Sequence, residues 1–268
     1  MKIPLTLNGV KMPFESDIAT LYEKCGSKHI LPFVGGAYSQ PDPDHFRLVV
    51  VGINSYISPP DWPKNDQELQ GWFRRWWQQA GHGRTSGTRP DTYLYYVRAF
   101  KEADMLARAL CTTSNCVGLQ YDGAPETKRG FYATNAIKVY TGEEHKRSNL
   151  IPGSYIESFA PTWRSELDLM AQYACLPHLI IVFAKGNIWD LHVRSLSPVA
   201  NSGAFTVTKC ESARGHDASR IWLDSGHTLL LVRLAHPRPR FPRPQPRNAA
   251  WLLADAEFRQ FAEIATPT

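Results

Sequence analysis

The stretch that decides the fold is His227-Thr-Leu-Leu-Leu-Val-Arg-Leu-Ala-His-Pro-Arg-Pro-Arg-Phe-Pro-Arg243. Residues 229–234 form a short, nearly unbroken apolar run, which favours a β-strand that is buried on both faces. Proline fixes φ and lacks an N–H group, so the alternating prolines after His236 predict a stiff loop outside regular structure. The sequence therefore predicts a buried strand that delivers a histidine onto an arginine-rich loop, which suits a functional site better than a core.

Three further apolar runs upstream have the same character and alternate with amphipathic segments. Strands are predicted over residues 46–51, 130–138 and 178–184. Helices are predicted over residues 17–24, 65–79, 91–110, 162–174, 188–193 and 248–264, and residues 196–227 are expected to be irregular, with possible short strands at 205–208 and 221–223. This alternation predicts an α/β fold: a single domain over residues 1–268, with a central, mostly parallel four-stranded sheet flanked by helices on both faces.

Composition favours a large core and a local basic surface. Of the 268 residues, 43% are hydrophobic, and the formal charge of +5 is only mildly basic. Basic side chains nevertheless gather at Arg238, Arg240, Arg243 and Arg247. Such a cluster suits a polyanion, although a solvated basic loop would have the same composition.

Cysteine usage and hydropathy indicate the compartment. The five cysteines are an odd number, their spacing matches no iron–sulfur pattern, and the N-terminal segment carries no apolar signal core. The apolar runs are too short to span a bilayer. We therefore expect a soluble, cytoplasmic protein that has free cysteines, no membrane partner, no metal and no other cofactor.

Three of the four predicted strands end in polar groups: Asn54 with Tyr56, then Asn135, then His236. Because the carboxyl ends of parallel strands share one edge of a sheet, we expect these groups to converge on one pocket. Each alone has an ordinary alternative, which is an Asx turn for an asparagine and a capping role for the histidine.

Four segments, taken in order, resemble the uracil-DNA glycosylase superfamily. Its members share a first motif of Gly-x-Asp/Asn/Glu-Pro type, an asparagine at the end of a middle strand, and a closing His-Pro-Ser-Pro loop. The similarity covers residues 46–243, and the first and last segments are more specific than the two short ones between them. The segments are Gly52-Ile-Asn-Ser-Tyr56, Phe131-Tyr-Ala-Thr-Asn135, Leu179-Ile-Ile-Val-Phe183 and Leu234-Ala-His-Pro-Arg-Pro-Arg240.

The resemblance implies a role for each matching residue. Asn54 corresponds to the residue that orients the attacking water, and Tyr56 to the tyrosine that excludes the C5-methyl group of thymine. Asn135 corresponds to the asparagine that reads the uracil edge, and His236 to the histidine that stabilises the charge on uracil O2. Arg240 corresponds to an arginine that fills the gap left by a flipped nucleotide.

Two sets of candidates complete the predicted site. Arg238, Arg240 and Arg243 are predicted to contact DNA. The aromatic residue that stacks on the base is predicted to be one of Phe33, Phe131 and Trp62.

The chemistry explains these residue types without the family. Cleavage of an N-glycosidic bond develops negative charge on the departing base, and loss of a preorganised donor such as His236 typically costs about 2.7–4 kcal/mol. Asn54 can orient a water but cannot take its proton at neutral pH. Lys138 and Lys185 lie near strand ends in no recognisable lyase context. The sequence thus predicts a monofunctional, metal-free DNA glycosylase that flips out and excises uracil or a related deaminated base.

Two alternatives remain open. Ser55 replaces the proline of the first motif and Arg238 replaces the serine of the last, which favours a catalytically silent nucleic-acid-binding protein on the same fold. The glycine-containing loop at residues 81–87 would instead suit an unrelated α/β enzyme that acts on a nucleotide or another phosphorylated small molecule.

Overall fold

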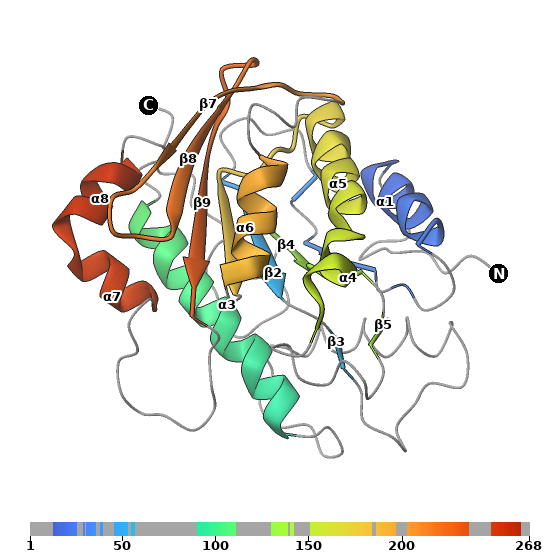
Figure 1. Ribbon diagram of the computed structural model, residues 1–268, viewed down its shortest axis with the longest axis horizontal. Coiled ribbons are helices and arrows are strands. Elements are labelled where there is room, and N and C mark those ends of the chain that lie inside the picture. The colour runs from blue at the N-terminus through green and yellow to red at the C-terminus, as the bar shows by residue number, and fades with distance from the viewer. Residues whose placement is uncertain are drawn as a thin grey trace.

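The structure is a computed structural model that describes residues 13–25, 29, 31–35, 38–39, 46–52, 55–56, 90–110, 130–138, 140–141, 151–183, 186–196, 203–235 and 248–263. Helices and strands alternate along most of the chain (Figure 1). In chain order the elements are α1 (Pro13–Glu23), β1 (Phe33–Val34), β2 (Leu48–Gly52), β3 (Ser55–Tyr56), α3 (Pro90–Leu110), β4 (Phe131–Asn135), β5 (Tyr140–Thr141), α4 (Gly153–Glu157), α5 (Ala160–Gln172), β6 (Leu179–Phe183), α6 (Gly186–Ser195), β7 (Val207–Ser212), β8 (Ala218–Leu223), β9 (Thr228–Leu234), α7 (Ala249–Ala254) and α8 (Ala256–Glu263).

The main sheet has seven strands in the order β1-β4-β2-β6-β9-β8-β7. Its centre, β4-β2-β6-β9, is parallel and consists of the four strands that the sequence predicts. Strand β1 pairs antiparallel with β4 at one edge, and at the other edge β8 pairs antiparallel with β9 and β7 pairs antiparallel with β8. The predicted α/β class is confirmed, whereas the prediction of a four-stranded, mostly parallel sheet is wrong, because the sheet is larger and mixed.

The added strands lack a clear apolar signal. In β8, Ser219 and Arg220 are buried, with 1% and 4% of their surface exposed, so polar residues occupy positions that a pattern search assigns to solvent. Strand β1 is only two residues long, and no strand is predicted from the sequence at that position. The turns on either side of β8 contain Gly215 and Gly226, whose φ angles of 76° and 81° favour glycine.

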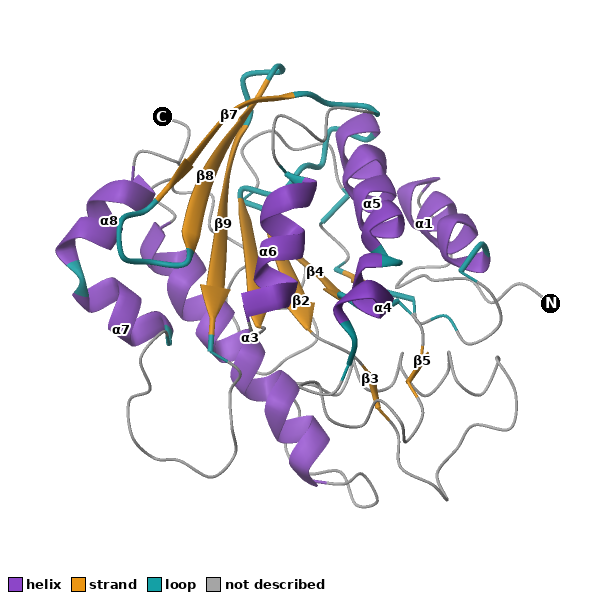
Figure 2. Ribbon diagram, viewed as in Figure 1, coloured by secondary structure: helices purple, strands orange, loops and turns teal. Residues whose placement is uncertain are grey.

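Helices cover both faces of the sheet, as predicted (Figure 2). Because side chains alternate along a strand, Val49 and Val51 of β2 point to one face and Leu48 and Val50 to the other. The first face packs against α1, α4, α5 and α6, which supply residues such as Trp163. The second face packs against α3, α7 and α8.

The helices differ from the predictions mainly at their ends. The predicted closing helix over 248–264 is two helices, because Asp255 adopts extended geometry between α7 and α8 and its carboxylate accepts the N–H of Phe258 at 3.0 Å. Asn248 caps α7, and its side chain accepts the N–H of Trp251 at 2.7 Å. The predicted helix at 65–79 lies outside the described residues. Within the described ranges, none of the helices combines the length and apolar character that crossing a membrane requires.

Candidate functional site at the carboxyl edge of the sheet

The four parallel strands end together. Gly52, the last residue of β2, is in register with Asn135, the last residue of β4. Phe183 of β6 is likewise in register with Leu234 of β9. In Figure 1 these strands point downward, so their carboxyl ends form the lower edge of the sheet.

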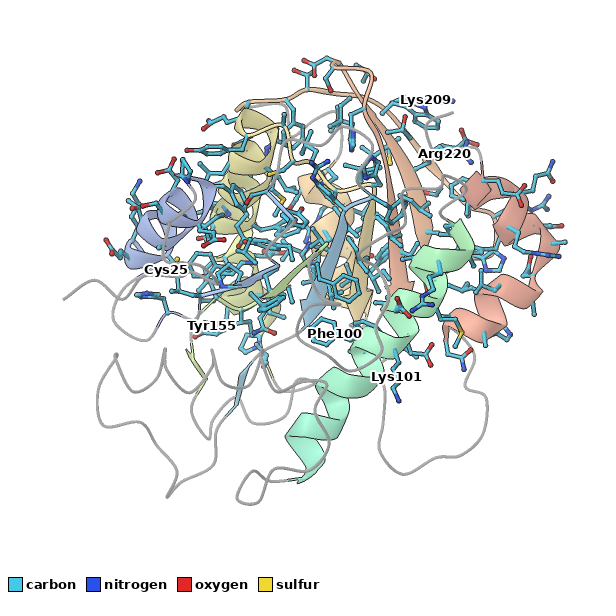
Figure 3. All side chains as sticks on the ribbon, turned by 180° about the vertical axis from the view of Figure 1, so that it is seen from behind. Cys25, Phe100, Lys101, Tyr155, Lys209 and Arg220 are labelled. Atoms are coloured by element: carbon cyan, nitrogen blue, oxygen red, sulfur yellow. The ribbon has the colours of Figure 1, made fainter. Side chains whose placement is uncertain are left out.

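This carboxyl edge contains a point where the chain changes faces. The part of the chain between β2 and β4 includes α3 on one face, and the part between β6 and β9 includes α6 on the other face, as the front and back views agree (Figures 1 and 3). In open parallel sheets, ligands bind in the crevice beyond such a point. The topology therefore favours a site just beyond the ends of β2 and β6.

Asn135 lies at this edge with 4% of its surface exposed. The next residue, Ala136, donates its N–H to the carbonyl oxygen of Gly52 at 2.9 Å, which extends the β2–β4 pairing past Asn135. Phe33 of β1 lies directly opposite Ala133, two residues before Asn135 and on the same face. Such diagonal neighbours are about 7–8 Å apart, and Phe33 has this relation both to Asn135 and to Phe131.

Phe131 lies elsewhere. It is the first residue of β4, at the opposite end of that strand from Asn135, and it is fully buried. Its ring stacks on Phe100 of α3 with the centroids 5.5 Å apart. Of the aromatic candidates that the structure describes, Phe33 is thus the one beside Asn135.

A second, two-stranded sheet follows β2 and β4 in the chain. Strand β3, which contains Tyr56, pairs in parallel with β5, so Tyr56 is in register with Thr141. Ser55 is in register with Tyr140. The next described element after β2 is therefore β3, which lies beside β5.

Most of the remaining predicted site residues are not part of the described chain. Gly52 and Ser55, on either side of Asn54, are described, as is Ala235, which precedes His236. The predicted residues that lie outside the described ranges are Asn54, His236, Arg238, Arg240, Arg243, Trp62 and Lys185, together with the loop at residues 81–87.

A buried ionic network lies on the other face of β4. Nζ of Lys138 is 2.5 Å from Oε1 of Glu166, and neither side chain is exposed. The hydroxyl of Tyr22 donates to Oε1 of Glu166 at 2.7 Å, and that of Tyr132 donates to Oε2 at 2.9 Å. Oγ1 of Thr134 lies 2.9 Å from both Nζ of Lys138 and the hydroxyl of Tyr22. We refer to these five residues as the Lys138–Glu166 network.

Burial sets the protonation of the network. It raises the pKa of Tyr22 and of Tyr132 well above the ordinary value, and the Glu166 carboxylate adds to this effect. Burial also lowers the pKa of Lys138, an effect that Glu166 opposes. Both tyrosines are therefore hydrogen-bond donors at neutral pH. The lysine and the glutamate balance each other's charge in a region without water contact.

His192 of α6 lies beside this network. Its ring meets that of Trp163 edge to face with the centroids 4.9 Å apart. Burial, together with the nearby Lys138, lowers the pKa of His192 to about 3, so the imidazole is neutral. Neither ring nitrogen of His192, nor the indole nitrogen of Trp163, has a hydrogen-bond partner in the described part of the chain.

The sequence analysis did not identify Glu166 or His192 as candidate site residues. It named Lys138 but assigned it no function. Glu166 lies three residues after Trp163 and four before Met170, both of which belong to the buried stripe of α5. Side chains at that spacing share one helix face. A charged residue on an apolar helix face was therefore the signal that could have revealed the network.

Two hollows flank α6, and Asn135 lines neither of them. The larger, about 320 Å³, lies between α4 and α6, and the pair Arg194–Glu157, with Nη2 2.8 Å from Oε1, is part of its wall. The smaller, about 190 Å³, lies between α6 and the β7–β8 hairpin and is lined by Trp189, Asp190, Val193, Arg194, Ser212, His216, Ala218 and Ser219.

Among the described residues, no three or more histidine, cysteine, aspartate or glutamate side chains gather as a metal site would require. A scan against protein-family models finds no match to the chain, and a search of curated proteins finds none either. The arrangement of the carboxyl edge is thus the observation on which a function rests.

Proposed function

We propose that the protein is a DNA glycosylase that removes uracil or a related deaminated base by hydrolysing the N-glycosidic bond of a flipped nucleotide. The observation that carries the proposal is the position of Asn135. It is buried beside Phe33 at the edge where β2 and β9 also end. Asn54 and His236 follow those two strand ends in the sequence.

The chemistry of Asn135 and Phe33 suits a planar base. One asparagine amide offers both a donor and an acceptor, which matches the paired acceptor and donor on the edge of uracil. A phenyl ring offers a face on which a base can stack. In such a site a base without the matching groups leaves the buried amide unpaired, which is the strongest source of discrimination that a binding site has.

The spacing of the strands suits the proposed division of roles. Strands β2 and β9 are separated by β6, so their ends are about 9.5 Å apart at ordinary strand spacing. A base and its sugar fit between side chains that approach from two such ends. The proposal gives Asn54 the attacking water on one side and His236 the leaving-group oxygen on the other.

Lys138 supports a hydrolytic rather than a lyase mechanism. Its side chain is fully buried and its ammonium group is committed to Glu166 and Thr134. A lysine in that position does not reach a sugar carbon to form a Schiff base. Lys138 is therefore not the nucleophile, and the proposal gives that role to water.

Arg238, Arg240 and Arg243 would contact DNA, with Arg240 filling the space that the flipped base leaves. The affinity of such contacts falls with salt, by a slope of about 0.9 for each phosphate neutralised. Arg240→Ala and Arg243→Ala are each expected to weaken DNA binding. Both should also flatten its salt dependence, which titrations at several salt concentrations measure. Unchanged affinity in both variants would remove the DNA-binding role of the loop.

Base release tests the catalytic claim. The protein is incubated with single- and double-stranded oligonucleotides that contain one uracil, and abasic sites are then cleaved with alkali. We expect strand breaks with the wild type and a loss of about 10²-fold or more in His236→Ala and Asn135→Ala. Lys209→Ala, an exposed change on β7, should retain full activity.

The same assay separates the alternatives. Binding of the oligonucleotides without any breaks would support a catalytically silent DNA-binding protein. Neither binding nor breaks would reject both readings.

A further inference from the structure

Asn135 lies between two anchored residues. Thr134, before it, is held by Lys138 at 2.9 Å through its hydroxyl group. Ala136, after it, is held by the carbonyl oxygen of Gly52, also at 2.9 Å. This hydrogen bond between the side chains of Lys138 and Thr134 links the two ends of the segment 134–138, which contains Asn135.

Hydrogen bonds to Glu166 connect this segment to helices α1 and α5. Glu166 of α5 accepts hydrogen bonds from Lys138, from Tyr22 of α1 and from Tyr132 of β4. The carboxylate thus joins three segments of the chain that are far apart in the sequence. A buried network in which the charged groups are all partnered permits few arrangements of its members, because any other arrangement leaves a buried polar group unpaired.

We infer that Lys138 and Glu166 are positioning residues that hold the Asn135 amide in the orientation that reads the base. The inference rests on the proposed function. Neither side chain is exposed, and the inference gives both a role that acts through Asn135 and not by contact with the substrate.

Stability alone is a weak explanation of this ion pair. Replacing a buried ion pair by apolar residues of similar volume is often neutral or stabilising, because removing two charges from water offsets their attraction. Leu167 and Met170, neighbours of Glu166 on α5, show that apolar residues pack well on the same helix face. We therefore attribute to the pair a role in orientation: its directional hydrogen bonds hold the segment that contains Asn135 in one arrangement.

Coupling to Asn135 tests the inference. The double variant Lys138→Met/Glu166→Met removes both charges, and Asn135→Ala is measured alone and in that background. We expect the double variant to lose about 10-fold or more in kcat with little change in KM, since contacts to the DNA backbone remain. If the pair acts only through Asn135, adding Asn135→Ala should bring kcat to the level of Asn135→Ala alone, a further loss of about 10-fold in place of about 10²-fold. Effects that multiply in full would show that the pair acts independently of Asn135 and would overturn the inference.

A matched control is the exposed pair Lys209–Glu211 on β7, which is 3.2 Å apart. Figure 3 shows Lys209 on the hairpin side of the molecule, away from the carboxyl edge. Lys209→Met/Glu211→Met should leave kcat and KM unchanged. If the buried double variant fails to fold, Tyr132→Phe removes one hydrogen bond to Glu166 and leaves both charges; we expect it to lose kcat by about 3-fold or more, and wild-type kcat in that variant would overturn the inference.

A second measurement is independent of catalysis. The side-chain amide resonances of Asn135, identified by their loss in Asn135→Ala, are compared between the wild type and the buried and exposed double variants. We expect them to shift or broaden only in the buried double variant, and unchanged resonances there would overturn the positioning role. A wild type that releases no base would instead reject the proposed function, while these resonances would still decide the positioning.

Discussion

Nζ of Lys138 lies 2.5 Å from Oε1 of Glu166 in a region that solvent does not reach. Removing either partner alone leaves a buried charge uncompensated, which typically costs about 3–5 kcal/mol. We therefore expect Lys138→Met/Glu166→Met to lose clearly less free energy of unfolding than the sum of the two single losses. Urea unfolding of the four proteins in this cycle measures the difference.

The exposed pair Lys209–Glu211 provides the comparison for that cycle. Its side chains are 62% and 47% exposed, so solvent screens their attraction. The same cycle on this pair should give a coupling of about 0–1 kcal/mol. A buried pair whose losses simply add would contradict the prediction.

His192 is expected to make the fold sensitive to mild acid. Burial lowers its pKa to about 3, whereas the unfolded chain takes up the proton near pH 6.5. Between these two pH values His192 is protonated only in the unfolded state. The contribution of neutral His192 to the free energy of unfolding is therefore fully present above about pH 6.5 and is lost as the pH falls. The slope is about 1.4 kcal/mol per pH unit for one such group.

The variant His192→Leu isolates this contribution. Because neither ring nitrogen has a hydrogen-bond partner, the substitution leaves no described partner unsatisfied. We expect similar stability at pH 7.5 and a shallower loss between pH 6 and pH 4.5, measured by urea unfolding at each pH. Identical slopes in the two proteins would show that His192 does not carry the effect.

At alkaline pH the tyrosines should dominate. Burial raises the pKa of Tyr22, Tyr38 and Tyr132 well above the ordinary value of 10. Above about pH 10 the folded state therefore keeps the tyrosine hydroxyl protons that the unfolded state releases. The contribution of these tyrosines to stability is fully present below about pH 10 and is lost as the pH rises above it. We expect the tyrosinate absorbance of these residues to rise together with loss of the circular dichroism signal. Complete tyrosine ionisation in the folded protein would contradict their burial.

Gly203 is expected to tolerate no side chain. Its φ is +105°, and a Cβ atom there would collide with the carboxylate of Asp168. That carboxylate accepts the N–H of Ala204 at 3.0 Å and pairs with Arg164 at 3.5 Å, so it is not free to move. We expect Gly203→Ala to lower the free energy of unfolding by about 2 kcal/mol or more.

Gly153, the first residue of α4, is the matched control. A Cβ atom there would meet nothing within 4 Å. Gly153→Ala should change stability by about 0.5 kcal/mol or less, measured by the same denaturant unfolding. Equal losses in the two variants would indicate that the collision with Asp168 is not the cause.

The centre of the sheet could be predicted because its signals are local. The runs that became β2 and β6 are apolar along their whole length, and that of β9 is apolar apart from Thr228 and Arg233, since helices cover both faces of a parallel sheet. Strand β8 was predicted only in part, because Ser219 and Arg220 are polar yet buried. Their burial depends on the neighbouring strands and on α8, where Phe261 lies 4.5 Å from the Arg220 guanidinium.

The residues of the candidate site likewise include some that the sequence could identify and some that required the tertiary structure. Asn135 could be selected from the sequence because a polar residue that ends an apolar strand is visible in the chain itself. Its neighbour Phe33 could not be ranked above Phe131 until the register of β1 on β4 was known. The Lys138–Glu166 pair joins residues that are 28 positions apart, so no local pattern contains it.

The sequence by itself determined the α/β class and the four apolar segments that form the parallel centre of the sheet, because hydrophobic periodicity is a property of short segments. Only the tertiary structure decided the strand order, the addition of β1 at one edge and of β8 and β7 at the other, the register of Phe33 on β4, and the buried ion pair on the opposite face of β4. The reason is physical. Sheet register and charge burial depend on contacts between segments far apart in the chain, and their energies appear only when those segments pack together.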